Sequence, residues 1–359
     1  MKYKYWLDNI EISSGKKQAL LKEFQSAKEI YQTKEKEYEK IPGWQEKDTR
    51  KIKEAKRQWD LEKRAEELDK KGIRIITCEQ EEYPERLRQI HDNPYALYVK
   101  GELPKEEQKS VAIVGARKCS EYGYYMAKKL GEVLGKNNVS VISGLADGID
   151  SAGQRGAVNL GGSTYAVLGC GVDICYPKSN RILYEQIAKT GGILSEYPPG
   201  TQPKSYYFPA RNRIISGLAD VVVVMEAKKK SGSLITADLA LEQGKEIYAL
   251  PGRVTDALSF GCNRLIREGA GVLISVEDFL TDCNIVSERK ENLSKNFKVS
   301  LAKEETLVYS CLGLEAKNID DILEETGLSV SCVAGVLMKL QMSGAIRESF
   351  KNHYIKTEI

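Results

Sequence analysis

The stretch Phe208–Thr236, FPARNRIISGLADVVVVMEAKKKSGSLIT, decides the predicted fold. Its centre, Val221–Met225, is an uninterrupted apolar run, which indicates a strand covered by helices on both faces. The turn after it carries small residues and hydroxyls where a new helix is expected, so free backbone N–H groups point outward and attract phosphates. With the Arg-Asn-Arg cluster before the strand, the stretch predicts a phosphate site. The alternative is an ordinary αβ connection whose arginines are solvated.

Outward from this stretch, short apolar runs alternate with helical patterns, which predicts an α/β fold with a doubly wound parallel sheet. Ligands of such sheets bind where the strands end at their carboxyl side. The predicted strands of this pattern are Val111–Val114, Val139–Ile142, Thr164–Leu168, Val221–Met225, Ile247–Leu250 and Val272–Ile274. Two further strands are predicted before them, at Ile73–Thr77 and near Ala96–Val99.

The residues directly after four of these runs share one chemistry. They are glycines, hydroxyls and cations, within the segments Gly115–Arg117, Ser143–Asp150, Gly169–Asn180 and Ser231–Thr236. Because the carboxyl ends of parallel strands meet at one edge, this recurrence predicts an anion site there.

Two familiar nucleotide motifs are absent. The turn after the first run, Gly115–Ser120, has no second glycine in place for a dinucleotide site, and Gly131–Asn137 has the wrong spacing for a P-loop. Arg211 and Arg213 project in different directions on a helix, so we expect one to contact the ligand and the other to brace the fold. Phe208, with Tyr206 and Tyr207 before it, either stacks on bases of single-stranded nucleic acid or packs its loop onto the sheet.

Composition limits the classes of function. The 359 residues carry a net charge of +3, so any nucleic-acid site has to be local. No apolar run approaches a membrane span, and the start lacks a signal-peptide core, which predicts a cytoplasmic protein with no membrane partner. The eight cysteines include no Cys-x-x-Cys pair, and the two histidines are far apart. We therefore expect no metal, no other cofactor and no catalytic triad.

The chain is expected to contain more than the sheet domain. The first part has helical patterns, a break at Pro42-Gly43, and a last helix over about Asp48–Lys71 closed by Gly72. The predicted parts are a helical domain over 1–72, the sheet domain over 73–282, a linker over 283–300 and a final domain over 301–359.

The final domain has the pattern of three short helices and a hairpin, which predicts a winged-helix-like domain. Its third helix carries one basic residue, Lys339. Duplex-DNA binding and a protein-interaction or vestigial role are therefore both left open.

Eight sequence motifs between Val111 and Leu273 resemble, in the same order, motifs of the DNA-processing protein A family (DprA, also called Smf). They are VAIVGAR, SGLADGID, GCGVDICYP, LSEYPPG, FPARNRIISGLAD, SGSLITADLALEQG, ALPGR and GCNRLIREGA. The resemblance implies an extended Rossmann-like domain, preceded by a SAM-like helical domain, that binds and protects single-stranded DNA without sequence preference. It also implies a homodimer, no enzymatic activity, and loading of the RecA recombinase onto DNA taken up in natural transformation.

Residue roles follow from the same resemblance. Arg117 and Lys178 would contact DNA phosphates, Lys204 approximates a lysine of the family, and Leu265 and Ile266 would lie near the dimer contact. The whole predicted DNA-binding set is Gly115, Arg117, Ser143, Gly144, Lys178, Asn180, Lys204, Phe208, Arg211, Asn212, Arg213, Ser231, Gly232, Ser233 and Thr236.

Two other functions fit the same scaffold. A phosphoribohydrolase of the lysine-decarboxylase-like type pairs an arginine with the glutamate of Pro-Gly-Gly-x-Gly-Thr-x-x-Glu. The comparable stretch here, SGSLITADLA, has no glutamate, although Asp238 is near. A sensor of small nucleotides would need a deep closed pocket rather than an open basic groove.

Overall fold

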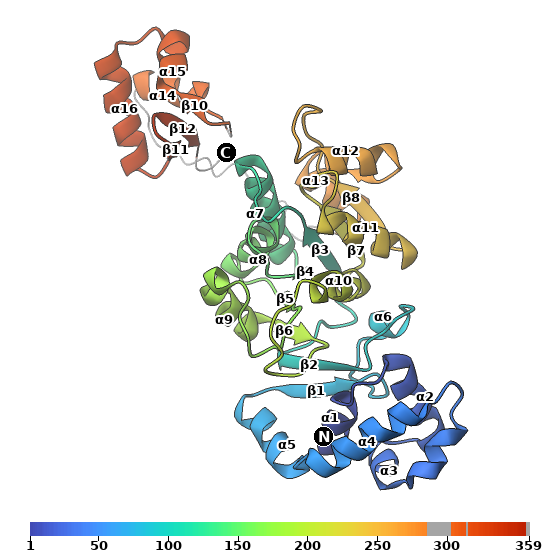
Figure 1. Ribbon diagram of the computed structural model, residues 1–359. Helices are drawn as coiled ribbons and strands as arrows, with labels where there is room; N and C mark the ends of the chain where they lie inside the picture. Colours follow the sequence, from blue (N-terminus) through green and yellow to red (C-terminus); the bar gives the residue numbers. More distant parts are fainter. Residues whose placement is uncertain (286–302, 314, 357–359) are drawn as a thin grey trace. The chain divides into compact units, whose positions relative to one another are not determined.

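The apolar runs assemble into one nine-stranded sheet. The computed structural model describes residues 1–285, 303–313 and 315–356, and the order of its large sheet is β1-β2-β6-β5-β4-β3-β7-β8-β9 (Figure 1). Neighbours from β6 to β9 pair in parallel, whereas β2 pairs antiparallel with both β1 and β6. The strands are β1 (Arg74–Thr77), β2 (Ala96–Gly101), β3 (Ser110–Val114), β4 (Ser140–Ser143), β5 (Thr164–Val167), β6 (Gly192–Ser195), β7 (Val221–Val224), β8 (Glu246–Ala249) and β9 (Gly271–Val272).

Every predicted run of the sheet domain overlaps a strand, although β9 contains only Val272 of its run, and the doubly wound α/β fold is confirmed. The sequence analysis missed β6, which has only Ile193 and Leu194 as apolar residues between two glycines and a serine. Such a short run gives no periodicity to recognise. In the structure β6 is an interior strand that joins the parallel strands to the antiparallel pair β1 and β2.

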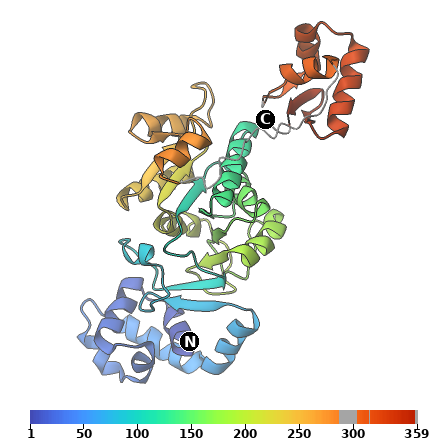
Figure 2. The ribbon, with the colours of Figure 1, turned by 180° about the vertical axis from the view of Figure 1, so that it is seen from behind.

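Helices cover both faces of the sheet because alternate strand residues point to opposite sides. In β3, Val111 and Ile113 pack with α7, α8 and α13, whereas Ala112 and Val114 pack with α10, α11 and α12. Figure 2 shows the same ribbon from behind, with helices on both sides of the sheet. The helices around the sheet are α6 (Glu85–Arg88), α7 (Glu121–Lys136), α8 (Ile149–Asn159), α9 (Arg181–Thr190), α10 (Tyr207–Leu218), α11 (Gly232–Glu242), α12 (Phe260–Arg267) and α13 (Val276–Asp282), with a 3-10 turn at Lys178–Asn180.

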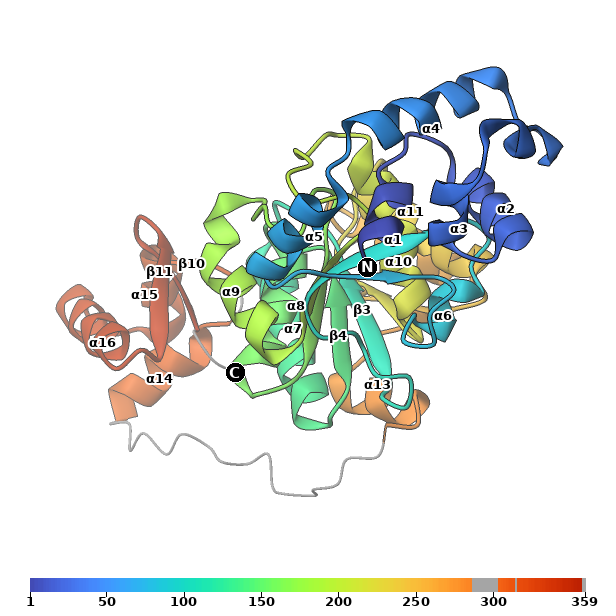
Figure 3. The same cartoon turned by 90° about the horizontal axis from the view of Figure 1, so that it is seen from below.

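The N-terminal helices pack beside β1 and β2 (Figure 3). They are α1 (Lys2–Asp8), α2 (Ser14–Phe24), α3 (Ala27–Gln32), α4 (Glu46–Gln58) and α5 (Leu61–Lys70), with a 3-10 helix at Glu35–Lys40. The predicted single helix over Asp48–Lys71 is two helices, because the Asp60 carboxylate accepts a hydrogen bond from Lys63 N at 3.1 Å and starts a new helix.

One buried hydroxyl holds this helical region to the sheet. The Tyr98 side chain of β2 is fully buried; its hydroxyl donates to Asp8 Oδ2 at 2.6 Å and accepts from Asn9 Nδ2 at 3.1 Å. Lys17, also buried, pairs with the other carboxylate oxygen of Asp8 at 3.2 Å. The helices and the sheet accordingly belong to one compact unit, Met1–Val286.

A second unit, Ser287–Ile359, has its own hydrophobic core. Ser329 caps α16 through Cys332 N, and Gly327 closes α15 with φ of 65°. Residues 286–300 of the predicted linker lie outside the described residues. The elements are α14 (Lys303–Cys311), α15 (Ile319–Thr326) and α16 (Val330–Met342), with a sheet of β10 (Lys317–Asn318), β12 (His353–Lys356) and β11 (Ile346–Phe350) in this order.

Among the described helices, none is both long and apolar enough to cross a membrane.

We expect Tyr98→Phe to lower the free energy of unfolding by about 2 kcal/mol, because it leaves a buried carboxylate oxygen without its donor. Urea denaturation of the purified protein measures this change. Tyr122→Phe is the control: Tyr122 is 37% exposed, and loss of its hydroxyl should cost less than about 0.5 kcal/mol. Equal stability of both variants would contradict the anchoring role of Tyr98.

Candidate nucleic-acid interface

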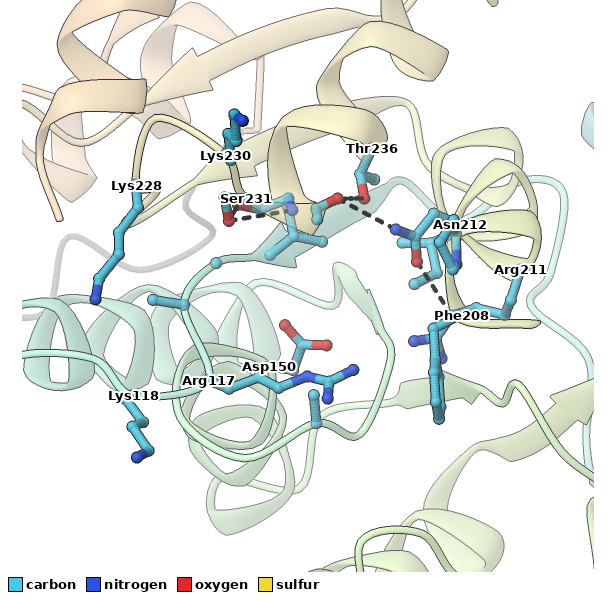
Figure 4. Close-up of a pocket in the computed structure, with 18 of the residues that line it drawn as sticks. Arg117, Lys118, Asp150, Phe208, Arg211, Asn212, Lys228, Lys230, Ser231 and Thr236 are labelled. Atoms are coloured by element: carbon cyan, nitrogen blue, oxygen red, sulfur yellow. Dashed lines mark hydrogen bonds between the residues drawn. The ribbon is translucent and has the colours of Figure 1, made fainter. Parts of the chain in front are cut away.

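A cleft of about 620 Å³ opens at the carboxyl ends of the parallel strands (Figure 4). Its walls come from the loops after β3, β4 and β7 and from the start of α10 and α11. Five basic side chains and one acidic side chain line it: Arg117, Lys118, Arg211, Lys228, Lys230 and Asp150. A concave surface with this imbalance of charge attracts an anion.

Four of the cations stand at the rim. Arg117, Lys118, Lys228 and Lys230 are exposed, and no ion pair joins any of them to a carboxylate of the described residues. Lys118 and Lys228 lie on one side of the cleft, and Arg117 reaches across it toward Phe208 (Figure 4). These charges are therefore available to phosphates of a ligand.

The start of α11 supplies backbone donors on the opposite wall. Ser231 caps the helix by accepting from Ser233 N at 3.4 Å, and its hydroxyl lies 2.8 Å from that of Ser233. Asn212 Nδ2 donates to Gly232 O at 3.3 Å, which ties the turn to α10. A helix start of this kind is a favourable site for a phosphate.

Arg211 organises the floor of the cleft. Its side chain is buried; Nη1 donates to Gly144 O at 3.1 Å and to Val167 O. Burial lowers the pKa of Arg211 to about 10, partly offset by the charge of Asp150, so it stays cationic at neutral pH. Burial likewise raises the pKa of the Asp150 carboxyl against the opposing effect of Arg211.

Two glycines are required by this close packing. A Cβ atom on residue 144 would lie 2.5 Å from Arg211 Nη2, and at Gly148, where φ is 78°, it would lie 2.4 Å from Ala116 O. A side chain at position 148 would push the loops after β3 and β4 apart, and one at position 144 would displace the Arg211 guanidinium. The SGLADG motif thus shapes the cleft through its backbone.

An aromatic pair forms the remaining wall. Tyr176 and Phe208 are stacked with ring centroids 5.5 Å apart, and the Arg117 guanidinium lies 5.2 Å from the Phe208 centroid. Tyr176 is 40% exposed. The wall therefore offers an aromatic face beside a cation, the combination that binds an unpaired base next to its phosphate.

The structure gathers most of the predicted site residues in one place. Gly144 lines a small recess beside the cleft, between Arg117 and Phe208. The predicted residues that line the cleft itself are Gly115, Arg117, Phe208, Arg211, Asn212, Ser231, Gly232, Ser233 and Thr236.

Other predicted residues have internal partners instead. Arg213 forms a two-pronged ion pair with Glu196, both contacts at 2.7 Å, and is not in the cleft lining. The Ser143 hydroxyl donates to Ile113 O at 2.6 Å, and Asn180 donates to Leu145 O at 3.0 Å. Leu265 is 4% exposed and packs in the core beneath the sheet, so we assign it to folding rather than to a contact surface.

The remaining predicted residues lie at the surface outside the cleft lining. Lys178 and Lys204 are exposed, and Ile266 is half-buried on α12. The sequence analysis missed Lys118, Lys228, Lys230 and Tyr176. The lysines follow the ends of β3 and β7, so the rule that selected the glycine-rich turns would also have selected them.

Comparisons with known proteins point to one family. Residues 74–284 match the family model of DNA recombination-mediator protein A, and residues 298–349 match that of the DprA winged helix domain. The DNA processing protein DprA of Streptococcus pneumoniae is 46% identical over 200 residues, which is 56% of this chain and 71% of that protein. The chain belongs to the DprA family.

Other DprA-family members support the same assignment. Protein Smf of Escherichia coli is 35% identical over 285 residues, covering 78% of this chain and 76% of that protein. The X-ray structure of DprA from Streptococcus pneumoniae superposes with a TM-score of 0.70 at 36% identity, over 79% of this chain and 98% of that chain. The match to the DprA winged helix domain confirms the predicted class of the C-terminal unit.

A second similar solved structure is that of DNA processing protein A from Helicobacter pylori. That structure concerns the single-stranded DNA binding mode of the Helicobacter pylori protein. The TM-score is 0.53 at 31% identity, over 59% of this chain and 96% of that chain.

We expect Arg213→Ala to lower the free energy of unfolding by about 3 kcal/mol, because it strands the carboxylate of Glu196, whose side chain is 16% exposed. Arg117→Ala, at the exposed rim, should leave stability unchanged. Urea midpoints of both variants test this assignment. An Arg213→Ala protein of wild-type stability would return Arg213 to the candidate ligand contacts.

Proposed function

We propose that this DprA-family chain binds single-stranded DNA without sequence preference in the cleft, protects it, and helps to load the RecA recombinase during natural transformation. Binding is the part that the cleft supports directly. Recombinase loading and a homodimer rest on membership of the family, and the proposed role is cytoplasmic and non-enzymatic.

The observation that carries the proposal is the ring of unpaired cations facing the start of α11. Each cation that neutralises a phosphate releases counterions, which favours binding without any reading of sequence. The cleft is lined mainly by side chains that suit phosphates and ring faces rather than base edges. This chemistry supports binding without sequence preference.

The aromatic wall favours a single strand over a duplex. Tyr176 and Phe208 need an unstacked base to contact, and a duplex keeps its ring faces inside the stack. A loop-lined cleft at the sheet edge also presents no helix or ribbon shaped to enter a major groove.

The lining argues against the phosphoribohydrolase alternative. Asp150 is the one acidic residue among the described residues that line the cleft, and it is buried, accepting from Gly144 N at 3.1 Å. A carboxylate that is buried, bonded to a backbone N–H and opposed by the charge of Arg211 is not free to stabilise an oxocarbenium-like transition state. Asp238 is not part of the lining.

We expect the triple variant Lys118→Ala/Lys228→Ala/Lys230→Ala to bind labelled oligothymidylate more weakly and with a shallower salt dependence. Each lost phosphate contact on a single strand reduces the log–log slope by about 0.7, so the slope should fall by about 2. Fluorescence anisotropy across a salt series measures both values, and a matching duplex should bind more weakly than the single strand.

The matched control is Lys40→Ala/Arg50→Ala/Lys70→Ala, which removes three cations of the helical region with side-chain exposures of 65%, 69% and 76%. It should retain the wild-type slope. If the salt-dependence slope decreases by the same amount in both triple variants, the general positive charge of the protein rather than the cleft accounts for DNA binding. A wild-type protein that binds no oligothymidylate would overturn the proposal.

The winged-helix unit is expected to make no duplex contact through α16. The exposed face of this helix carries Val330, Ala334, Met338 and Met342, and Lys339 is paired with Glu305 at 3.4 Å. Met338→Glu/Met342→Glu would repel phosphates if the helix entered a groove. We expect this variant to bind duplex and single strand within about twofold of wild type in the same assay. A tenfold loss for duplex would place α16 on DNA.

A further inference from the structure

A cluster of aromatic rings lies beside the cleft, at the end of β6. Tyr206 and Tyr207 have ring centroids 4.5 Å apart, and the Tyr207 and Tyr197 centroids are 4.1 Å apart. Lys204 Nζ is 5.8 Å from the Tyr206 centroid and 5.7 Å from that of Tyr207. Tyr206 is 61% exposed, so a large ring face meets solvent here.

The cluster is continuous with the cleft along the chain. Pro203, Ser205 and Phe208 line the cleft, whereas Lys204, Tyr206 and Tyr207 between them are outside its lining. Tyr197 follows β6, and Tyr207 begins α10, the helix that carries Phe208 into the cleft. A ligand that leaves the cleft past Phe208 therefore meets the tyrosine cluster next.

The chemistry of the cluster matches a strand of unpaired bases. Aromatic rings bind bases of any sequence through stacking, and an adjacent lysine pairs with the phosphate between them. The exposed ring of Tyr206 is held by the Tyr207 ring and by Lys204, so it is ordered before the ligand arrives and stacking costs little conformational entropy. Lys204, above both rings, supplies the charge.

The sheet sets the length of such a track. From β7, next to Lys228 and Ser231, to β6, next to Tyr197, the order is β7-β3-β4-β5-β6. Four spacings of about 4.8 Å give about 19 Å. At about 3.4 Å per nucleotide, the spacing along a fully stacked strand, this edge accommodates at most about six nucleotides.

We propose that Tyr206 and Tyr207, with Lys204, form a stacking platform that extends the single-strand site beyond the cleft. This proposal rests on the proposed function and adds a second subsite to it. The cleft holds the first nucleotides through phosphate contacts, and the platform holds the bases that follow.

The test compares a four-nucleotide with a twelve-nucleotide oligothymidylate. We expect Tyr206→Leu to weaken binding of the longer strand about tenfold and of the shorter strand less than twofold, because only the longer strand reaches the platform. Tyr206→Phe keeps the ring face and should bind both strands as wild type does. Phe350→Leu, which removes a ring that is 57% exposed in the C-terminal unit, is the matched control.

A second readout reports stacking directly. A 2-aminopurine base placed at successive positions of the longer strand should be quenched at one or two of them in wild type and Tyr206→Phe, and not in Tyr206→Leu. Equal affinity of Tyr206→Leu and wild type for the longer strand, with unchanged quenching, would overturn the platform while leaving the cleft intact. Absence of any binding by wild type would overturn the proposed function and the platform with it.

Discussion

The buried guanidinium of Arg211 is the contact on which the cleft depends. It lies on α10 and donates to the carbonyl oxygens of Gly144 after β4 and Val167 at the end of β5. A buried cation is tolerated only where its donors are satisfied and an opposite charge is near, and Asp150 provides that charge. One side chain therefore fixes α10, two strand ends and the first turn of α8 relative to one another. Phe208, one turn earlier on α10, is held over the cleft as a consequence.

This arrangement separates the cations of the site into two kinds. Arg211 is buried near the charge of Asp150, and Arg213 is half-buried and ion-paired with Glu196, so both hold the backbone in place. The other four cations are exposed, and no carboxylate of the described chain neutralises their charge: Arg117, Lys118, Lys228 and Lys230. A ligand phosphate gains more from the second kind, because the first kind already has its hydrogen bonds. The arginines that look most conspicuous in the sequence thus shape the site, and less conspicuous lysines face the solvent.

The fold could be predicted from the sequence more completely than the roles of single residues. Apolar runs such as Val221–Val224 predict a buried parallel strand, and the glycine-rich turns after them predict the ligand edge; both follow from local patterns. Tertiary contacts decided the rest. Arg213 and Glu196 are 17 residues apart, and no local pattern predicts their ion pair. In the same way, no local pattern predicts that Asn180 donates a hydrogen bond to Leu145 O. The short run at β6 forms an interior strand because β2 and β5 flank it.

A locally charged cleft on a nearly neutral chain has a consequence for selectivity. The net charge is +3, so little long-range attraction comes from the molecule as a whole. At physiological salt, interactions between exposed charges fade beyond about 8 Å. A phosphate therefore gains binding free energy only when it comes close to the rim lysines. A flexible strand can bend each phosphate into that range while its bases turn toward Tyr176 and Phe208. A stiff duplex cannot bend into the cleft, so most of its phosphates stay too far from the rim cations to bind them. Shape and screening together therefore favour single strands here, without any contact that distinguishes one base from another.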